Sequence, residues 1–499
     1  MEFPLKLCSL VLTLLIICIG YPLLLLFLIP LWIYRSLVVK LFKSLDPKVG
    51  SILQGMDAIM SAHSPYTNCR SVLIPHFFLA SSIDLNTFIK TFNTKIVQFK
   101  TPEGKLLYTK LKQRIISKFG YHFWYTVDNF QLEDHIRYLD DTCLEREVDS
   151  KELAELTNQL SQRNFNPTRS PWEIIIIPKL KHDKDPTIKS VVILRFHHCF
   201  LDGFSILKLF ERLGDKAWTT ISPRNTPKVE KSSSISTILP TLNVLFRGPY
   251  EILRAFYFSG EDNEWLQKIT KQPSGIVSMQ LTNQIPMETL KKIVVKSKGE
   301  FTIAIILHTI ILQVAGRAMA KQNAIQVEKN HLVKIHTGSP WPLPNHPCES
   351  SSGLTNHYSI IKFPVTVDLN DVRETARNVS RAYKCLAFSV LPRAFKALTD
   401  ILGSFPIPFI EKSDGGLTGT VLLSNFQGPF KRVDICGVEC KEWVTIAKAT
   451  ACALSSLTLS YAGGFRCVLS ADKCILTQND MDTLAVSCEK IVKELHQLL

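Results

Sequence analysis

The residues best suited to chemistry stand together in the segment HHCFLDG at positions 197–203. Histidine is the side chain whose ordinary pKa is nearest neutrality, so His197 or His198 can take a proton from a hydroxyl group and later return it to a leaving group. Asp202 can hold the local geometry as a helix cap or through a salt bridge, and Gly203 permits a tight turn and a close approach. The alternative interpretation is a pair of core histidines followed by an ordinary helix cap.

The elements around this segment indicate how its side chains are held. Residues 172–177 and 191–196 are rich in β-branched residues and are predicted to be strands of a covered sheet. Apolar residues then recur at helical spacing, which predicts a helix from Asp202 to Leu213 with Asp202 at its cap. The segment therefore begins at the end of a strand. A strand end at the edge of a sheet can hold a side chain rigidly toward a cleft.

Later parts of the chain predict further elements. The stretch 239–258 is apolar and aromatic; a helix packed on the body is slightly favoured over one lying on a membrane. Residues 302–318 are predicted to form a strong helix and 481–498 a closing helix. Strands are expected at 358–367 and 418–423.

Composition narrows the class of protein. Of 499 residues, 46% are hydrophobic and 20% are charged, which excludes wholesale disorder. The 13 cysteines include no Cys-x-x-Cys pair, so neither a zinc site nor a full disulfide framework is indicated, and a reducing compartment fits best. The net charge of +14 suits an anionic membrane surface or a phosphorylated ligand; no basic-aromatic patch supports nucleic-acid binding.

The N-terminal segment predicts a membrane anchor. No charged residue occurs between Lys6 and Arg35, a length sufficient to cross a bilayer. Basic residues follow this stretch, so we expect a single-pass protein, in the endoplasmic reticulum, whose body faces the cytosol. Pro22 and Pro30 leave a re-entrant hairpin as the alternative.

A linker rich in Ser, Thr, Pro and Lys, which begins at Thr219, separates two globular parts. The resulting division has four parts: a membrane anchor (1–45), an N-terminal domain with the histidine pair (46–218), a linker with a connecting helix (219–279) and a C-terminal domain (280–499).

The chain resembles a known family. HHCFLDG matches the HHxxxDG signature of acyl-CoA-dependent acyltransferases with the chloramphenicol acetyltransferase fold, and about residues 50–497 resemble the wax ester synthase/diacylglycerol acyltransferase family. Weaker similarities follow in the family's order: FWYTVDNFQLEDHIRYL (123–139), RSPWEIIII (169–177), GLTNHYSIIKFPV (353–365), LLSNFQGPF (422–430) and the closing segment 456–484. The resemblance implies an α/β fold of two chloramphenicol-acetyltransferase-like domains with a tunnel between them, beside the N-terminal transmembrane helix.

The resemblance also implies a reaction. A fatty acyl group passes directly from acyl-CoA to a long-chain alcohol, giving a wax ester, or to diacylglycerol, giving triacylglycerol. Acyl-CoA is then a co-substrate, and no metal or cofactor is expected because a thioester is already activated. His198 is the expected general base, His197 and Asp202 orient and support it, and Gly203 keeps room beside the thioester. The substrates and membrane lipids are the expected partners.

Other residues are less clearly assigned. Ser424 and Asn425 form a polar turn whose groups are candidates for substrate binding at the oxyanion, and a plain structural turn is the alternative. His135, His308 and His357 are expected to be structural.

One departure from the family keeps other functions open. The family's Thr-Val-Asn-Asp-Val-Leu segment corresponds to residues 302–307, where Ala304 and Ile305 replace the polar pair. A catalytically silent lipid-binding membrane protein of the same fold is therefore one alternative. An acyltransferase for a sterol, an amine or a short alcohol is another, because tunnel shape selects the acceptor.

The topology makes a prediction about glycosylation. The sequon at Asn378-Val379-Ser380 should remain unmodified in intact cells, because a body facing the cytosol never meets the glycosylation machinery. The mobility of the protein on gels before and after glycosidase treatment checks this. A glycan on Asn378 would contradict both the topology and the reducing compartment.

Overall fold

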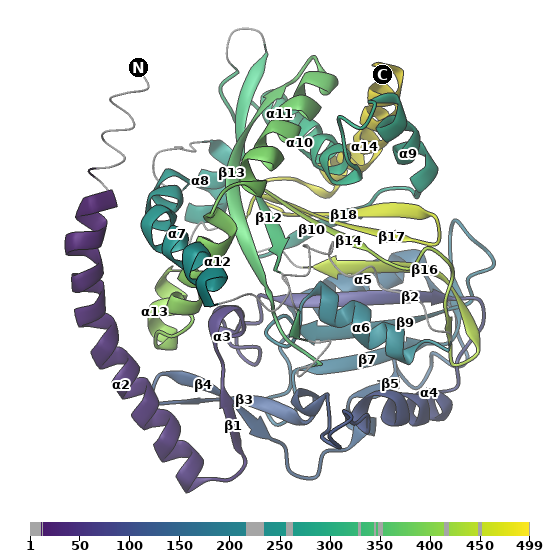
Figure 1. Ribbon diagram of the computed structural model, residues 1–499. Helices are drawn as coiled ribbons and strands as arrows, with labels where there is room; N and C mark the ends of the chain where they lie inside the picture. Colours follow the sequence, from purple (N-terminus) through teal and green to yellow (C-terminus); the bar gives the residue numbers. More distant parts are fainter. Residues whose placement is uncertain are drawn as a thin grey trace.

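Two mixed sheets form the centre of the computed structural model (Figure 1). It describes residues 11, 13–215, 234–255, 263–327, 331–343, 346–347, 353–413, 419–447 and 452–498. The first sheet runs β15 (Asp434–Ile435), β16 (Val438–Ala447), β2 (Val72–Leu79), β9 (Ser190–His197), β7 (Trp172–Ile177) and β5 (Ile136–Tyr138). The second runs β10 (Val277–Leu281), β18 (Gly464–Asp472), β17 (Leu454–Tyr461), β14 (Val421–Gln427), β12 (Leu332–Pro342) and β13 (Tyr358–Asp368), with β11 (Ile285–Pro286) also paired to β18.

Smaller elements complete the fold. A three-stranded sheet contains β1 (Val49–Ile52), β4 (Tyr121–Thr126) and β3 (Gln113–Lys118), and β6 (Val148–Asp149) pairs with β8 (Leu180–Lys181). The helices of the body are α3 (Gly55–Ser61), α4 (Leu85–Phe92), α5 (Ser150–Gln162), α6 (Gly203–Leu213), α7 (Ser234–Leu253), α8 (Glu264–Lys271), α9 (Met287–Lys296), α10 (Ile303–Lys321), α11 (Val372–Ala387), α12 (Leu391–Leu402), α13 (Ile407–Ser413) and α14 (Gln478–Leu498). Residues 219–233 of the predicted linker lie outside the described residues.

The first sheet is covered on both faces, as its apolar strands predicted. Every residue of β9 is buried, and β7 pairs with it antiparallel, which confirms the strands expected at 172–177 and 191–196. Arg195 is the charged exception within β9; its guanidinium contacts the Glu173 carboxylate of β7 at 2.8 Å. A buried charge of this kind is tolerated because it is paired.

The C-terminal part of the chain contributes strands to both sheets. β16 pairs antiparallel with β2 in the first sheet, whereas β17 and β18 belong to the second. Trp443 of β16 and Phe77 of β2 share one hydrophobic cluster with Leu457 and Leu459 of β17. The two sheets are therefore joined by a common core as well as by the chain. The division of the sequence into consecutive domains did not predict this exchange of strands.

The second sheet is covered by α10, α11, α14 and α9 (Figure 1). The Thr302 hydroxyl caps α10 by accepting from the Ile305 backbone N–H at 3.3 Å, so the helix predicted at 302–318 is confirmed. The closing helix is α14, and β13 and β14 are the expected later strands. Position 418, where the β14 strand was expected to begin, lies outside the described residues.

The N-terminal apolar segment is one helix. Residues Thr13–Leu45 are long and apolar enough to cross a membrane by length and composition. A π-helical turn at Ile16–Gly20 leads into α2 (Tyr21–Leu45), and Pro30 lies inside α2 without dividing it. The described residues therefore adopt no hairpin at this point. The second helix that passes the same test, Ile303–Lys321, is a buried core helix.

α7 is packed against α12, as the favoured interpretation of 239–258 predicted. The helices approach closely at Gly248, where an added Cβ would lie 3.0 Å from the Cβ of Ala394. Leu242, Leu245 and Phe246 nevertheless remain exposed, so this helix also presents an apolar surface. Residues 256–258 lie outside the described part of the chain.

The core position of Ile305 predicts the result of restoring the family's aspartate. Ile305 belongs to the core cluster around α10, and an unpaired carboxylate there would lose its hydration. Ile305→Asp should lower the free energy of unfolding by about 3–5 kcal/mol. Ala304→Asn, at the neighbouring half-buried position, should have a smaller effect. Denaturant unfolding of the detergent-solubilised protein measures both; equal stabilities of Ile305→Asp and wild type would contradict the packing described.

Candidate active site

The histidine pair lies where β9 ends. His197 is the last residue of β9, and Asp202 is the N-cap residue of α6. The Asp202 carboxylate accepts a hydrogen bond from the Ser205 backbone N–H at 3.0 Å, which confirms the predicted cap. His198 lies in the connecting turn, where its backbone N–H donates to the carbonyl oxygen of Ser71 at 2.9 Å. The turn is therefore fixed at both of its ends.

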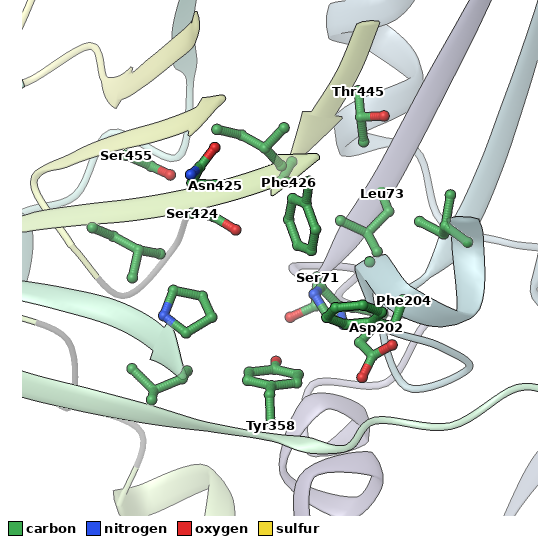
Figure 2. A pocket seen from close by; sticks show the side chains of 18 of the residues that line it. Ser71, Leu73, Asp202, Phe204, Tyr358, Ser424, Asn425, Phe426, Thr445 and Ser455 are labelled. Carbon is green, nitrogen blue, oxygen red and sulfur yellow. The ribbon is translucent and has the colours of Figure 1, made fainter. Parts of the chain in front are cut away.

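A cavity of about 220 Å³ lies between the two sheets beside this turn (Figure 2). The first-sheet side is built by α3, β2, β16 and α6, and the second-sheet side by β12, β13, β14 and β17. Most lining side chains are aliphatic or aromatic. Among the residues singled out from the sequence, the lining includes His198, Asp202, Gly203, Ser424 and Asn425. The fold thus brings together two groups of residues that are far apart in the chain.

His197 does not line the cavity. Its side chain is fully buried, next to the ring of Phe165, and burial lowers its pKa to about 3. Because the imidazolium form would lose its hydration, His197 is neutral near pH 7. The Cys199 backbone N–H donates to its Nδ1 at 3.4 Å, and its Nε2 has no hydrogen-bond partner in the part of the chain that the structure describes.

His198 is supported by a half-buried polar chain. The Asn356 side-chain amide donates to the carbonyl oxygen of His198 at 2.7 Å and to the Asp57 carboxylate at 2.9 Å. Asp57 in turn contacts the Lys110 ammonium at 2.8 Å. Burial is the main cause that lowers the pKa of His198; hydrogen bonding and the nearby carboxylate of Asp202 oppose it in part. His198 is therefore an unprotonated imidazole near pH 7, as a general base must be.

Asp202 joins the two halves of the site. Its carboxylate accepts from His346 Nε2 at 2.9 Å and from the His357 backbone N–H at 2.8 Å. Burial favours the neutral acid, but these donors and the Ser205 N–H hold the pKa of Asp202 below its ordinary value. The sequence predicted a cap or a salt bridge for Asp202 without a partner, and the structure shows that the side-chain partner is His346. His357, expected to be structural, contributes its backbone to the same carboxylate.

Gly203 is required by close packing. A Cβ added at this position would lie 1.8 Å from a ring carbon of Phe426, which comes from β14 of the second sheet. The space beside Gly203 is therefore occupied by an aromatic ring that also lines the cavity. Any side chain at position 203 would displace this ring.

Ser424 and Asn425 lie in a strand, so the expectation of a turn at these positions is wrong. β14 continues to Gln427 because its parallel ladder with β17 extends that far, and the Gly428-Pro429 pair follows it. Side chains alternate along a strand, and Figure 2 shows Ser424 and Asn425 leaving β14 on different sides. Ser424 is half-buried and Asn425 is exposed.

The sequence did not single out several residues of the site. Tyr358 of β13 reaches the cavity wall (Figure 2), with its ring centroid 6.1 Å from that of His198. Burial raises the pKa of Tyr358, so its hydroxyl stays protonated. Asn356 lay in a segment similar to the family, but Asp57 and His346 carry no local signal, since their contacts arise only when the sheets come together.

His135 and His308, which were expected to be structural, have structural contacts. His135 Nδ1 hydrogen-bonds the carbonyl oxygen of Trp172 at 2.8 Å. His308 lies between the hydroxyls of Tyr383 and Thr337 at 3.0 and 2.7 Å. Within the described ranges there is no group of three or more His, Cys, Asp or Glu side chains that could hold a metal ion.

The HHxxxDG segment lies at the wall of a cavity between two sheets, which is the arrangement that the resemblance to acyl-CoA-dependent acyltransferases implied. The protein-family model described as "Wax ester synthase/diacylglycerol acyltransferase catalytic domain" matches residues 53–271. A second family model, "WS/DGAT C-terminal domain", matches residues 354–498. The chain belongs to the wax ester synthase/diacylglycerol acyltransferase family and is an acyl-CoA-dependent acyltransferase.

Solved structures confirm the fold. The wax ester synthase/diacylglycerol acyltransferase from Marinobacter aquaeolei VT8 is 12% identical, with a TM-score of 0.54 over 89% of this chain and 100% of that one. The TRI3 trichothecene 15-O-acetyltransferase from Fusarium sporotrichioides is 11% identical, with a TM-score of 0.57 over 90% and 96%. A mutant of the starter condensation domain of rhizomide synthetase RzmA, in complex with C8-CoA, is 11% identical, with a TM-score of 0.56 over 91% and 96%. No curated protein matches the sequence.

The contacts of Asp202 predict a stability loss larger than that of a helix cap. Asp202→Ala should lower the free energy of unfolding by about 3–5 kcal/mol, because buried donors lose their charged partner. The matched control is Asp84→Ala, which removes the exposed N-cap of α4 and should cost about 0.5–2 kcal/mol. Denaturant unfolding compares the two variants. Equal losses would mean that Asp202 acts only as a cap.

Proposed function

We propose that this enzyme transfers a fatty acyl group from acyl-CoA to the hydroxyl of a long-chain alcohol, of diacylglycerol, or of both, with His198 as the general base. The observation that carries the proposal is a neutral His198 on the wall of an apolar cavity between the two sheets. Leu73, Leu422 and Leu457 line this cavity, which suits an alkyl chain better than a polar acceptor.

The proposed reaction needs one base that acts twice. His198 takes the proton of the acceptor hydroxyl while the hydroxyl oxygen attacks the thioester carbonyl. The tetrahedral intermediate collapses, its C–S bond breaks, and His198 returns the proton to the sulfur of CoA. The products are the ester and free CoA. Cys199 is an unsuitable nucleophile, because it is fully buried and burial raises the pKa of its thiol, so direct transfer is favoured over an acyl-enzyme.

Other residues have supporting roles in this proposal. His197 and Asp202 hold the turn that carries His198, and Gly203 allows Phe426 to close one side of the cavity. Ser424 and Asn425 are the candidates for substrate binding near the oxyanion, and the half-buried Ser424 hydroxyl is the better placed donor.

We further propose that the enzyme works at the cytosolic face of the endoplasmic reticulum membrane, attached through its N-terminal helix. Two features support this: the apolar helix Thr13–Leu45, and the free cysteines in the described part of the chain, which suit a reducing compartment. A single span, as expected from the sequence, is one way to attach. The contacts of α2 with the body support a different one.

The proposal predicts the behaviour of a His198 variant. His198→Ala should lower product formation per folded enzyme by about 10²–10⁴-fold, since a methyl group cannot move the proton. The measurement uses membranes that carry the protein, labelled acyl-CoA, and a panel of a long-chain alcohol, diacylglycerol, a sterol and a short alcohol. His308→Ala is the matched control, since that buried histidine lies outside the cavity lining.

The pH profile provides a second measurement. Because the pKa of His198 is lowered, the wild-type rate should stay near its maximum as pH falls through 6.5, and decline only as pH falls through the lowered pKa.

A folded His198→Ala enzyme with near wild-type turnover would overturn the mechanism. Products from the sterol or the short alcohol alone would instead overturn the proposed acceptor.

A further inference from the structure

The N-terminal half of α2 lies against the body. The Tyr21 hydroxyl donates a hydrogen bond to the carbonyl oxygen of Leu245 in α7 at 2.5 Å. One turn and a half further along, the Phe27 ring meets Phe405 edge-on, with ring centroids 5.9 Å apart. Phe405 lies in the short connection between α12 and α13. Two separate parts of the body therefore contact this half of the helix.

The C-terminal half of α2 also lies against the body. The Tyr34 hydroxyl donates to the carbonyl oxygen of Phe119 at 3.2 Å, and the Phe42 ring packs on Phe119 and Phe123 with centroids 5.4 and 5.7 Å apart. Val38 is buried in a small hydrophobic cluster that includes Phe123. These partners belong to the β3–β4 hairpin and its turn. Figure 1 shows α2 running along one edge of the molecule from α7 to this hairpin.

These contacts are incompatible with a span across the bilayer. From Tyr21 to Phe42 the helix is roughly 32 Å long at about 1.5 Å per residue, which equals the thickness of a hydrocarbon core of about 30 Å. A spanning α2 that kept its contacts would carry the β3–β4 turn and the α12–α13 connection into or across the lipid. Irregular backbone exposed to lipid does not occur, because its polar groups would lack partners.

The exposed side of α2 is apolar from Leu23 to Leu37, and exposed lysines follow in its last turns. No residue in the most apolar 18-residue stretch of this helix is buried in the body. Its exposed side chains are Leu23, Leu25, Leu26, Ile29, Trp32, Ile33, Leu37 and Leu41. Neighbouring helices add Leu242 and Phe246 from α7 and Phe409 from α13. We call these residues the α2 face. Large apolar side chains exposed over several turns of one helix and on its neighbours mark an interaction or membrane surface.

We propose that the α2 face is a docking surface for a phospholipid bilayer, in which α2 lies in the plane of the cytosolic leaflet instead of crossing the membrane. In an ordinary interfacial helix the polar face points to water; here the body covers that side of the helix. Trp32 and the exposed Lys40 and Lys43 supply the aromatic and basic groups that favour an interface. A second copy of the chain on this face is the competing occupant.

This arrangement has a consequence for the cavity. α3, which contributes Ile59 and Met60 to the cavity lining, packs against α12 and α13. Because Phe405 between those two helices contacts α2, the α3 wall lies one layer of helices from the α2 face. Docking by this face would keep the site close to lipid, where apolar acceptors are dissolved.

The first experiment determines the side of the membrane on which the N-terminus lies. The full-length chain carries a glycosylation sequon and an epitope added before Met1, in sealed microsomes. We expect no glycan, and loss of the epitope on external protease treatment together with the body. An N-terminal glycan with a protease-sensitive body would overturn in-plane docking while leaving membrane attachment intact. The inference rests on the proposed membrane attachment; a protein wholly in the soluble fraction would overturn both.

The second experiment tests the face itself. The double variant Phe246→Glu/Phe409→Glu changes exposed residues outside α2, and Val295→Glu on α9 is the matched control at another exposed apolar position. Flotation with phosphatidylcholine/phosphatidylserine vesicles should show at least a tenfold lower vesicle-bound fraction for the double variant and no change for the control. An unchanged partition of the double variant would overturn the proposal, as would a detergent-solubilised dimer that the same changes dissociate.

Discussion

The Asp202 carboxylate is the interaction on which the site depends. It caps α6 through Ser205 in the first half of the molecule and accepts from His346 and His357 in the second. A buried charge is stable only when donors surround it, so these partners must come together for the carboxylate to remain ionised. Since His198 lies a few residues earlier in the same turn, its place at the cavity is set by the contact that joins the two halves.

Burial then decides the chemical state of each group around the cavity. The same loss of hydration lowers the pKa of His197 and His198 and raises that of Cys199 and Tyr358. The result is a pair of neutral imidazoles, a protonated thiol and a protonated phenol. This set suits proton transfer by a base better than attack by a thiolate, and it is a product of packing around one turn.

The apolar character of the protein has two separate uses in the structure. α10 and α2 both pass the length and composition test for a membrane span, yet α10 is the centre of the second core, whereas α2 lies on the surface. The difference is the number of sides that the body covers. α10 is enclosed by helices and a sheet; α2 touches the body along a single line through Tyr21, Phe27 and Phe42. Its other sides need another apolar medium.

The sequence by itself determined the local elements and the family: the strand before His197, the helix capped by Asp202, the apolar helix before Arg35 and the HHxxxDG segment depend on neighbours in the chain and carry local patterns. Only the tertiary structure decided that β16 joins the first sheet, that Ser424 and Asn425 lie in a strand, and that His346 pairs with Asp202. The physical reason is distance along the chain. Hydrogen bonds of a strand ladder and of a buried carboxylate need partners from remote segments, and no local pattern of residues records which segments will meet.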